Sequence, residues 1–230
     1  MLPINIYMMF KTNRKLYYLT FVLNYVCLLS TYTRSAWIAF AVQLIILLVY
    51  FFKHNKNELS KFYKLIVILL VCTISFDLVT DYSVSQRILS IFIDIEKIAT
   101  NTDILTVGSS RFDIWAMTPE LFKNHPFFGY GLENLTGLTD SGIIFDRMHN
   151  EILDVLISSG IFALIFYLLF LFKQYKEMFC NFFKTHNKLQ LLVVICCVGY
   201  FTQSLLNISM PGIASIYWVL LGLTNIDYES

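Results

Sequence analysis

A histidine and an arginine stand together just before a long apolar run. Arg147 and His149 lie two residues apart, and the residues that follow, 152–172, are almost all hydrophobic. An imidazole titrates near neutral pH and can take a proton from a hydroxyl group, so His149 is the candidate catalytic residue. The alternative is an interfacial histidine that only hydrogen-bonds the start of the helix. Glu151 and Asp154 close by favour the catalytic interpretation.

Three arginines, Arg34, Arg111 and Arg147, are candidates for binding a phosphate-containing substrate. Arg34 lies in a short connection between two apolar runs, where the free N–H groups of the next helix also favour an anion. Guanidinium groups bind phosphate oxygens in a planar fork, so three arginines and a histidine at one place would suit a diphosphate. The alternatives are that Arg34 snorkels to the interface and that the other two are surface charges.

The composition predicts a membrane protein. Of the 230 residues 57% are hydrophobic and only 14% are charged, whereas soluble domains carry about a quarter charged residues. No basic stripe or RNA-binding motif is present, so we expect no nucleic-acid partner. The five cysteines show no metal-ligand spacing, and we expect neither a metal site nor a cofactor.

Apolar runs place the elements that must position these residues. We expect an all-α, polytopic membrane bundle of about six transmembrane helices, with one large extracytoplasmic loop region that contains short helices. The chain then divides into residues 1–80 with three spans, 81–150 as the loop region and 151–230 with three more spans. The predicted spans are 16–30, which could be lengthened by residues 8–10, then 36–52, 65–80, 152–172, 189–206 and a weak sixth at 213–223.

The distribution of charge predicts the orientation. Residues 1–15, 53–64, 173–188 and 224–230 together hold eleven Lys or Arg and four acids, and the other side holds six Lys or Arg. Cytoplasmic loops carry the excess of positive charge. We therefore expect a multi-pass protein of the cytoplasmic (inner) membrane, with 31–35, 81–150 and 207–212 outside and the active face extracytoplasmic.

Local signals predict further helices and their ends. Residues 84–100 have apolar residues at helical spacing, so this segment should lie on the membrane surface or pack over the spans. Ser110 and Asp113 fit a capping box, and Thr118 before Pro119 fits an N-cap. Asn150 should cap the fourth span, and Asp77 is interpreted as a polar residue at a helix end rather than a site residue.

Four pieces of sequence, in this order, resemble the O-antigen ligase/polymerase family of polysaccharide membrane enzymes. The resemblance covers roughly residues 30–170 and matches the C-terminal half of that family. The pieces are Thr33-Arg34-Ser35-Ala36-Trp37, then Arg111-Phe112-Asp113-Ile114-Trp115, then His125-Pro126-Phe127-Phe128-Gly129-Tyr130-Gly131-Leu132-Glu133-Asn134, and finally His149-Asn150-Glu151 ahead of Ser159-Gly160-Ile161.

The resemblance implies a glycosyltransferase of surface polysaccharide synthesis, such as that of lipopolysaccharide or capsule. Its donor would be a polyprenyl-diphosphate-linked saccharide at the outer leaflet, and the leaving group would be the lipid diphosphate. Arg34 and Arg111 would hold the diphosphate, and His149 would act as general base on the acceptor hydroxyl or would position it. Arg147 matches no strong family position and is included for its proximity to His149.

The chain departs from that family in length. Members usually have ten to twelve spans, so about six spans suggest a truncated frame, a fragment or a subunit whose partner supplies the missing helices. Three alternatives therefore stay open: a polymerase or a ligase, a non-catalytic envelope protein such as a transporter or assembly subunit, and an inactive truncated family member. A transporter should show polar residues deep within its spans, and these spans hold few beyond Gln43, Asp77 and Gln203.

Overall fold

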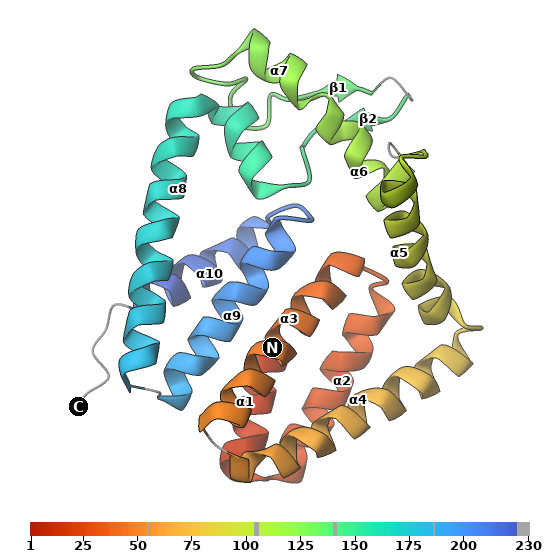
Figure 1. Ribbon diagram of the computed structural model, residues 1–230, viewed down its shortest axis with the longest axis vertical. Coiled ribbons are helices and arrows are strands. Elements are labelled where there is room, and N and C mark those ends of the chain that lie inside the picture. The colour runs from red at the N-terminus through yellow and green to blue at the C-terminus, as the bar shows by residue number, and fades with distance from the viewer. Residues whose placement is uncertain (55, 104–105, 140–141, 186, 225–230) are drawn as a thin grey trace. The chain divides into compact units, whose positions relative to one another are not determined.

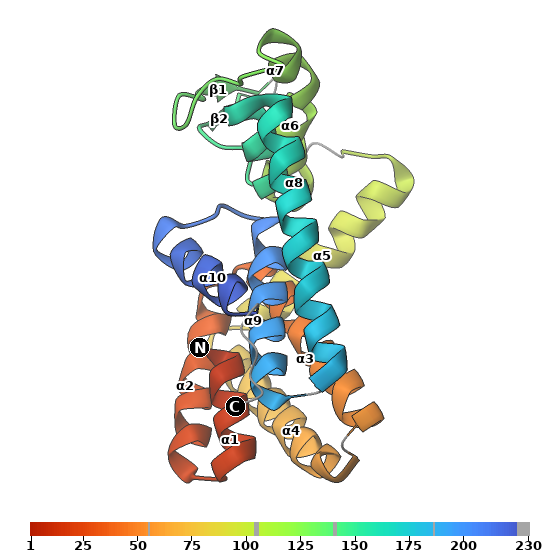
Figure 2. The same cartoon turned by 90° about the vertical axis from the view of Figure 1, so that its left-hand side faces the viewer.

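The computed structural model (Figures 1 and 2) describes residues 1–54, 56–103, 106–139, 142–185 and 187–224. Almost all of its regular structure is helical, which confirms the predicted all-α class. The chain forms two compact units. The first comprises Met1–Leu89 and Cys180–Gln203, and the second comprises Ser90–Phe179 and Ser204–Ser230.

The first unit is built from apolar helices. Asn5 on α1 accepts a hydrogen bond of 3.2 Å from the Thr20 hydroxyl on α2, and the two helices lie side by side (Figure 2). Gln43 on α3 donates to the carbonyl of Ile195 on α9 at 3.2 Å, and Gly199 lets that side chain lie against the α9 backbone. The helices begin and end at α1 Leu2–Thr12, α2 Lys15–Ser30, α3 Arg34–His54, η1 Lys56–Glu58, α4 Leu59–Val79 and α9 Lys188–Ser204.

The second unit combines short elements with one long helix. Two-residue strands β1 and β2 pair antiparallel, with Gly137 opposite Phe145, an element that the sequence did not predict. Helix α5 passes from the first unit into the second, and its Phe92 and Ile95 are exposed, as expected of an apolar face made for lipid or for another helix. The elements are α5 Ser83–Thr100, α6 Val107–Ala116, α7 Thr118–Asn124, β1 Gly137–Leu138, β2 Ile144–Phe145, α8 Glu151–Thr185 and α10 Pro211–Leu223.

The helices agree with the predicted spans in place but differ in length. Within the described residues, α3, α4 and α8 are long and apolar enough to cross a membrane, and three shorter apolar helices coincide with the first, fifth and sixth predicted spans. The expectation that residues 8–10 lengthen the first span was wrong, because Asn13 adopts a left-handed conformation that separates α1 from α2. The predicted loop 173–188 is instead a helical continuation of α8 to Thr185.

Several predicted helix ends can be compared with the structure. Asp77 accepts hydrogen bonds from the N–H groups of Val84 and Ser85 at the start of α5, which confirms its role at a helix end. The N-cap of α7 is Met117 rather than Thr118, which is the first helical residue. Ser110 has φ +65°, whereas an N-cap residue is normally extended, so the predicted capping box is wrong.

Asn150 caps α8, as predicted. Its Oδ1 accepts hydrogen bonds from the N–H groups of Ile152 at 3.0 Å and Leu153 at 3.2 Å. Its Nδ2 donates to the carbonyl of Leu205 at 2.9 Å. One side chain therefore accepts hydrogen bonds from the free N–H groups at the start of α8 and also links that helix to the segment that follows α9.

Replacing Asn150 should separate these two roles. Asn150→Ala removes both and should lower the free energy of unfolding by about 0.5–2 kcal/mol, the usual cost of a lost N-cap. Asn150→Asp keeps the capping oxygen and should lose less. Equilibrium unfolding in detergent micelles measures both, with the exposed Asn134→Ala as control. Equal stability of Asn150→Ala and the unchanged protein would contradict the capping role.

Candidate functional site

A small apolar cluster of its own holds the short elements of the second unit together. Met148 and Ile157 are almost fully buried in it, against Ile114 of α6 and Phe145 of β2. Tyr130 packs against the same cluster. The residue before His149 is therefore fixed in a core, and the histidine projects from a rigid base.

Helix α8 is broken at Gly160, and the 126–131 loop is docked into the break (Figure 1). Gly160 has φ +81° and ψ −178°. The loop replaces hydrogen bonds that the helix loses. Tyr130 N–H donates to the carbonyl of Ile157 at 2.9 Å and Gly131 N–H to that of Ser158 at 2.8 Å, while Ile161 N–H donates to the carbonyl of Pro126 at 2.9 Å.

Two glycines allow this approach. A Cβ on Gly160 would lie 2.1 Å from the carbonyl oxygen of Phe127, and a Cβ on Gly129 would lie 2.4 Å from the carbonyl carbon of Ser158. Both glycines also have positive φ. Two of the pieces that carry the family resemblance, 125–134 and 159–161, are therefore one structural device.

Several hydrogen bonds set the position of His149. The indole Nε1 of Trp115 donates to the carbonyl of Met148 at 2.7 Å, and the Met148 N–H donates to Oδ1 of Asp154 at 2.6 Å. His149 itself has φ +53°, a left-handed conformation that is uncommon for a residue with a side chain. Trp115, which belongs to one of the pieces that carry the family resemblance, thus holds the backbone next to His149.

The imidazole of His149 is half-buried and surrounded by charge. Its pKa lies below the ordinary 6.5, mainly because burial disfavours the charged ring, and the positive charges of Arg111 and Arg147 lower it further. Asp146 and a hydrogen bond with the Asn207 side chain act in the opposite direction. Nδ1 is buried without a hydrogen-bond partner. The ring is therefore neutral at pH 7, and one nitrogen keeps an unused position for a hydrogen bond.

Arg147 forms a weak, solvent-exposed ion pair. Its Nη2 lies 3.3 Å from Oε1 of Glu133, and the Glu133 side chain is 81% exposed. An exposed ion pair of this kind contributes only ~0–1 kcal/mol, so an incoming phosphate could replace it at little cost. Two of the three predicted arginines, Arg111 and Arg147, thus belong to the same unit as His149 and act on its charge.

Arg34 belongs to the first unit. It is the first residue of α3, whereas the sequence placed it in the connection before a span that begins at residue 36, and it is half-buried. The neighbouring Ser35 is almost fully buried, and its hydroxyl has no hydrogen-bond partner. That Arg34 meets the other arginines and His149 in one site stays a prediction.

Asn207 is the site residue that the sequence did not reveal. It follows α9, 58 residues after His149, and no periodicity or motif links the two. The only sequence signal is that residues 207–212 were predicted to lie on the same membrane face as His149.

Comparisons with known proteins find a family model and a relative that match much of the chain. A protein-family model described as O-antigen ligase matches residues 19–168. The ComP-specific O-oligosaccharyltransferase of Acinetobacter baylyi is 31% identical over an alignment of 192 positions, which covers 77% of this chain and 31% of that protein. The chain thus spans about a third of the length of this relative. No solved structure matches the chain.

Gly160→Ala should disrupt the docked loop. An alanine must leave the φ of +81°, a region that costs about 1–3 kcal/mol and is almost confined to glycine, or push back the Phe127 carbonyl. We expect lower stability and faster amide hydrogen exchange at Tyr130 and Gly131. Gly222→Ala in α10 is the control, since nothing lies within 4 Å of its added Cβ. Unchanged exchange in the Gly160 variant would show that the break does not depend on the loop.

Proposed function

This chain belongs to the O-antigen ligase family, and from that membership we propose that it is a membrane glycosyltransferase of surface polysaccharide synthesis that uses a polyprenyl-diphosphate-linked saccharide. The observation that supports this most strongly is the neutral, half-buried histidine at the head of α8 beside two arginines. The matched range, 19–168, includes Arg34, Arg111, Arg147 and His149.

The arginines suit a lipid diphosphate. Arg111 and Arg147 lower the pKa of His149, so their positive charge is effective at the site. We propose that they bind the diphosphate together with Arg34 and stabilise the negative charge that develops as the sugar–phosphate bond breaks. Such a leaving group is already a good one, and the proposed reaction needs neither a metal nor a cofactor.

His149 would act as the general base for the acceptor hydroxyl group. A neutral imidazole can accept the proton of a hydroxyl group as the oxygen attacks the anomeric carbon. The name of the A. baylyi relative, an O-oligosaccharyltransferase, describes transfer to oxygen in that protein. The acceptor here is proposed only as a hydroxyl group, and a polymerase and a ligase share this chemistry.

The membrane face follows from the charge distribution. The chain is a multi-pass membrane protein. With the basic segments in the cytoplasm, the start of α8 and the 126–131 loop face outward from the cytoplasmic membrane, where a flipped lipid-linked donor is available. Because the chain covers 31% of its relative, we propose that additional helices, from a partner or a longer form, complete the binding site for the lipid-linked donor.

Replacing the histidine tests the catalytic proposal. His149→Ala should reduce saccharide transfer about 10²–10⁴-fold, the usual contribution of a general base, at unchanged protein level. The amount and chain length of the host glycan give the measurement. His54→Ala, at the exposed end of α3, is the control and should have no effect. Normal glycan in cells that carry His149→Ala would remove the catalytic assignment.

The electrostatic coupling can be tested without a substrate. Because the charge of Arg111 lowers the pKa of His149, Arg111→Gln should raise it toward 6.5. NMR titration of ring-labelled histidine measures this pKa directly, and His149→Ala assigns the signal among the four histidines. Lys123→Gln, which removes an exposed charge from α7, should leave the pKa unchanged. A His149 pKa that is the same with and without Arg111 would contradict the coupling.

A further inference from the structure

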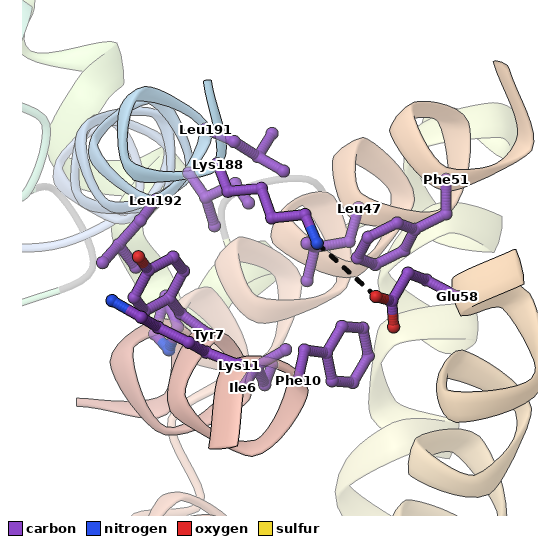
Figure 3. Close-up of a pocket in the computed structure, with 12 residues that line it drawn as sticks. Ile6, Tyr7, Phe10, Lys11, Leu47, Phe51, Glu58, Lys188, Leu191 and Leu192 are labelled. Atoms are coloured by element: carbon purple, nitrogen blue, oxygen red, sulfur yellow. Dashed lines mark hydrogen bonds and ion pairs between the residues drawn. The ribbon is translucent and has the colours of Figure 1, made fainter. Parts of the chain in front are cut away.

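The first unit contains a cavity of about 370 Å³ that the proposed reaction does not use. It lies between α1, the last turns of α3, Glu58 of η1 and the first half of α9 (Figure 3). Its volume falls within the range of small-molecule sites, roughly 300–1,000 Å³. Every residue that lines it belongs to the first unit, so the cavity is defined within that unit alone.

One part of the cavity wall is apolar. Leu47 and Phe51 of α3 and Leu191 of α9 are buried residues that line it, with Ile6 and Phe10 of α1. Alkyl and aromatic surface of this kind would accommodate a hydrocarbon chain and gain about 25 cal/mol for each Å² of apolar area that is buried.

The other part carries positive charge. Lys188 Nζ lies 3.4 Å and Lys61 Nζ 2.8 Å from the Glu58 carboxylate, so two ammonium groups share one acid. Figure 3 shows Lys188 reaching from α9 toward Glu58, with Leu47 and Phe51 beside the pair. Lys11 is the second lysine of the lining, and its Nζ lies 5.6 Å from the centre of the Tyr7 ring. The lining itself holds Lys11, Lys188 and Glu58, a formal net charge of about +1, and Lys61 lies beside Glu58 outside the lining.

The cavity is separate from the proposed donor site. Helix α3 has 21 residues, from Arg34 to His54, and therefore spans about 30 Å. Arg34 is at its first residue, whereas Leu47 and Phe51 are near its other end. A lipid bound here would thus occupy the opposite leaflet from one whose phosphates contact Arg34.

We propose that this cavity binds a phospholipid of the bilayer that has an anionic headgroup. The phosphate contacts Lys11 and Lys188, and one acyl chain lies along Leu47, Phe51 and Leu191. The charge complementarity selects an anionic over a zwitterionic lipid, and basic sites between membrane helices at the cytoplasmic face commonly bind such headgroups. The bound lipid would join α1 and α9 to the α3–α4 pair.

The test uses the full chain in detergent micelles, titrated with dioleoyl-phosphatidylglycerol or dioleoyl-phosphatidylcholine and followed by native mass spectrometry. We expect phosphatidylglycerol to be retained at lower concentration than phosphatidylcholine, since the two differ only in their headgroups. The variant with Lys11→Gln and Lys188→Gln should bind phosphatidylglycerol about 25-fold more weakly, from about fivefold per lysine. Lys64→Gln, an exposed lysine of α4 that does not line the cavity, is the matched control.

A second variant addresses the apolar part. Leu192→Trp adds a ring to a half-buried lining position and should weaken binding of both lipids without changing their ratio. If the double lysine variant does not fold, the rise in melting temperature of the unchanged protein with each lipid replaces it. Equal binding or equal stabilisation by the two lipids would overturn the proposal, and so would a protein segment occupying the cavity in place of lipid.

Discussion

A helix that is interrupted in an apolar setting must find new partners for its backbone. In lipid an unsatisfied N–H or C=O group costs several kcal/mol, so a break is stable only where protein replaces the lost bonds. Helix α8 meets this condition at Gly160. Its Ile157 and Ser158 carbonyls and its Ile161 N–H are all bonded to the backbone of the 126–131 loop. Because the bonds are between backbone groups, the loop backbone must approach the helix backbone closely. Glycine at positions 129 and 160 permits this approach, since a Cβ at either position would clash with the facing backbone.

The position of His149 depends on the same docking. Ile157, whose carbonyl accepts the loop, is also a member of the apolar cluster that buries Met148. Tyr130, which donates to that carbonyl, packs against the same cluster. The break, the loop and the cluster are therefore one cooperative structure, and the backbone of His149 is held at its edge by Trp115 and Asp154. A site built in this way is rigid although most of its residues lie outside regular helices.

The sequence predicted the features that depend on local pattern. Hydropathy located the apolar helices, the amphipathic period located 84–100, and the residue type of Asn150 identified a helix cap. The sequence-based prediction ended this helix at residue 172, too early, because hydropathy detects where an apolar run ends and not where a helix ends. Lys173, Lys176 and Lys184 end the apolar run, yet lysine is a good helix former, and the helix continues.

Features that depend on contacts distant in sequence were not predictable. The order of the pieces at 125–134 and 159–161 supported a family resemblance, but it did not indicate that one replaces the hydrogen bonds of the other. The left-handed run from Gly108 to Ser110 had no clear signal either, since serine rarely adopts positive φ. The bond between His149 and Asn207 joins segments that only the tertiary fold relates.

The two ends of α3 lie beside different sets of positive charges. One end carries Arg34 and the buried Ser35 hydroxyl at a helix N-terminus, and the other end contributes to a cavity bounded by lysines. The positive-inside rule requires only that lysines be abundant on the cytoplasmic side. It does not require that Lys61 and Lys188 share a single acid over an apolar cavity. The lysines of the cavity wall lie beside apolar side chains, which is the arrangement that the proposed anionic lipid requires.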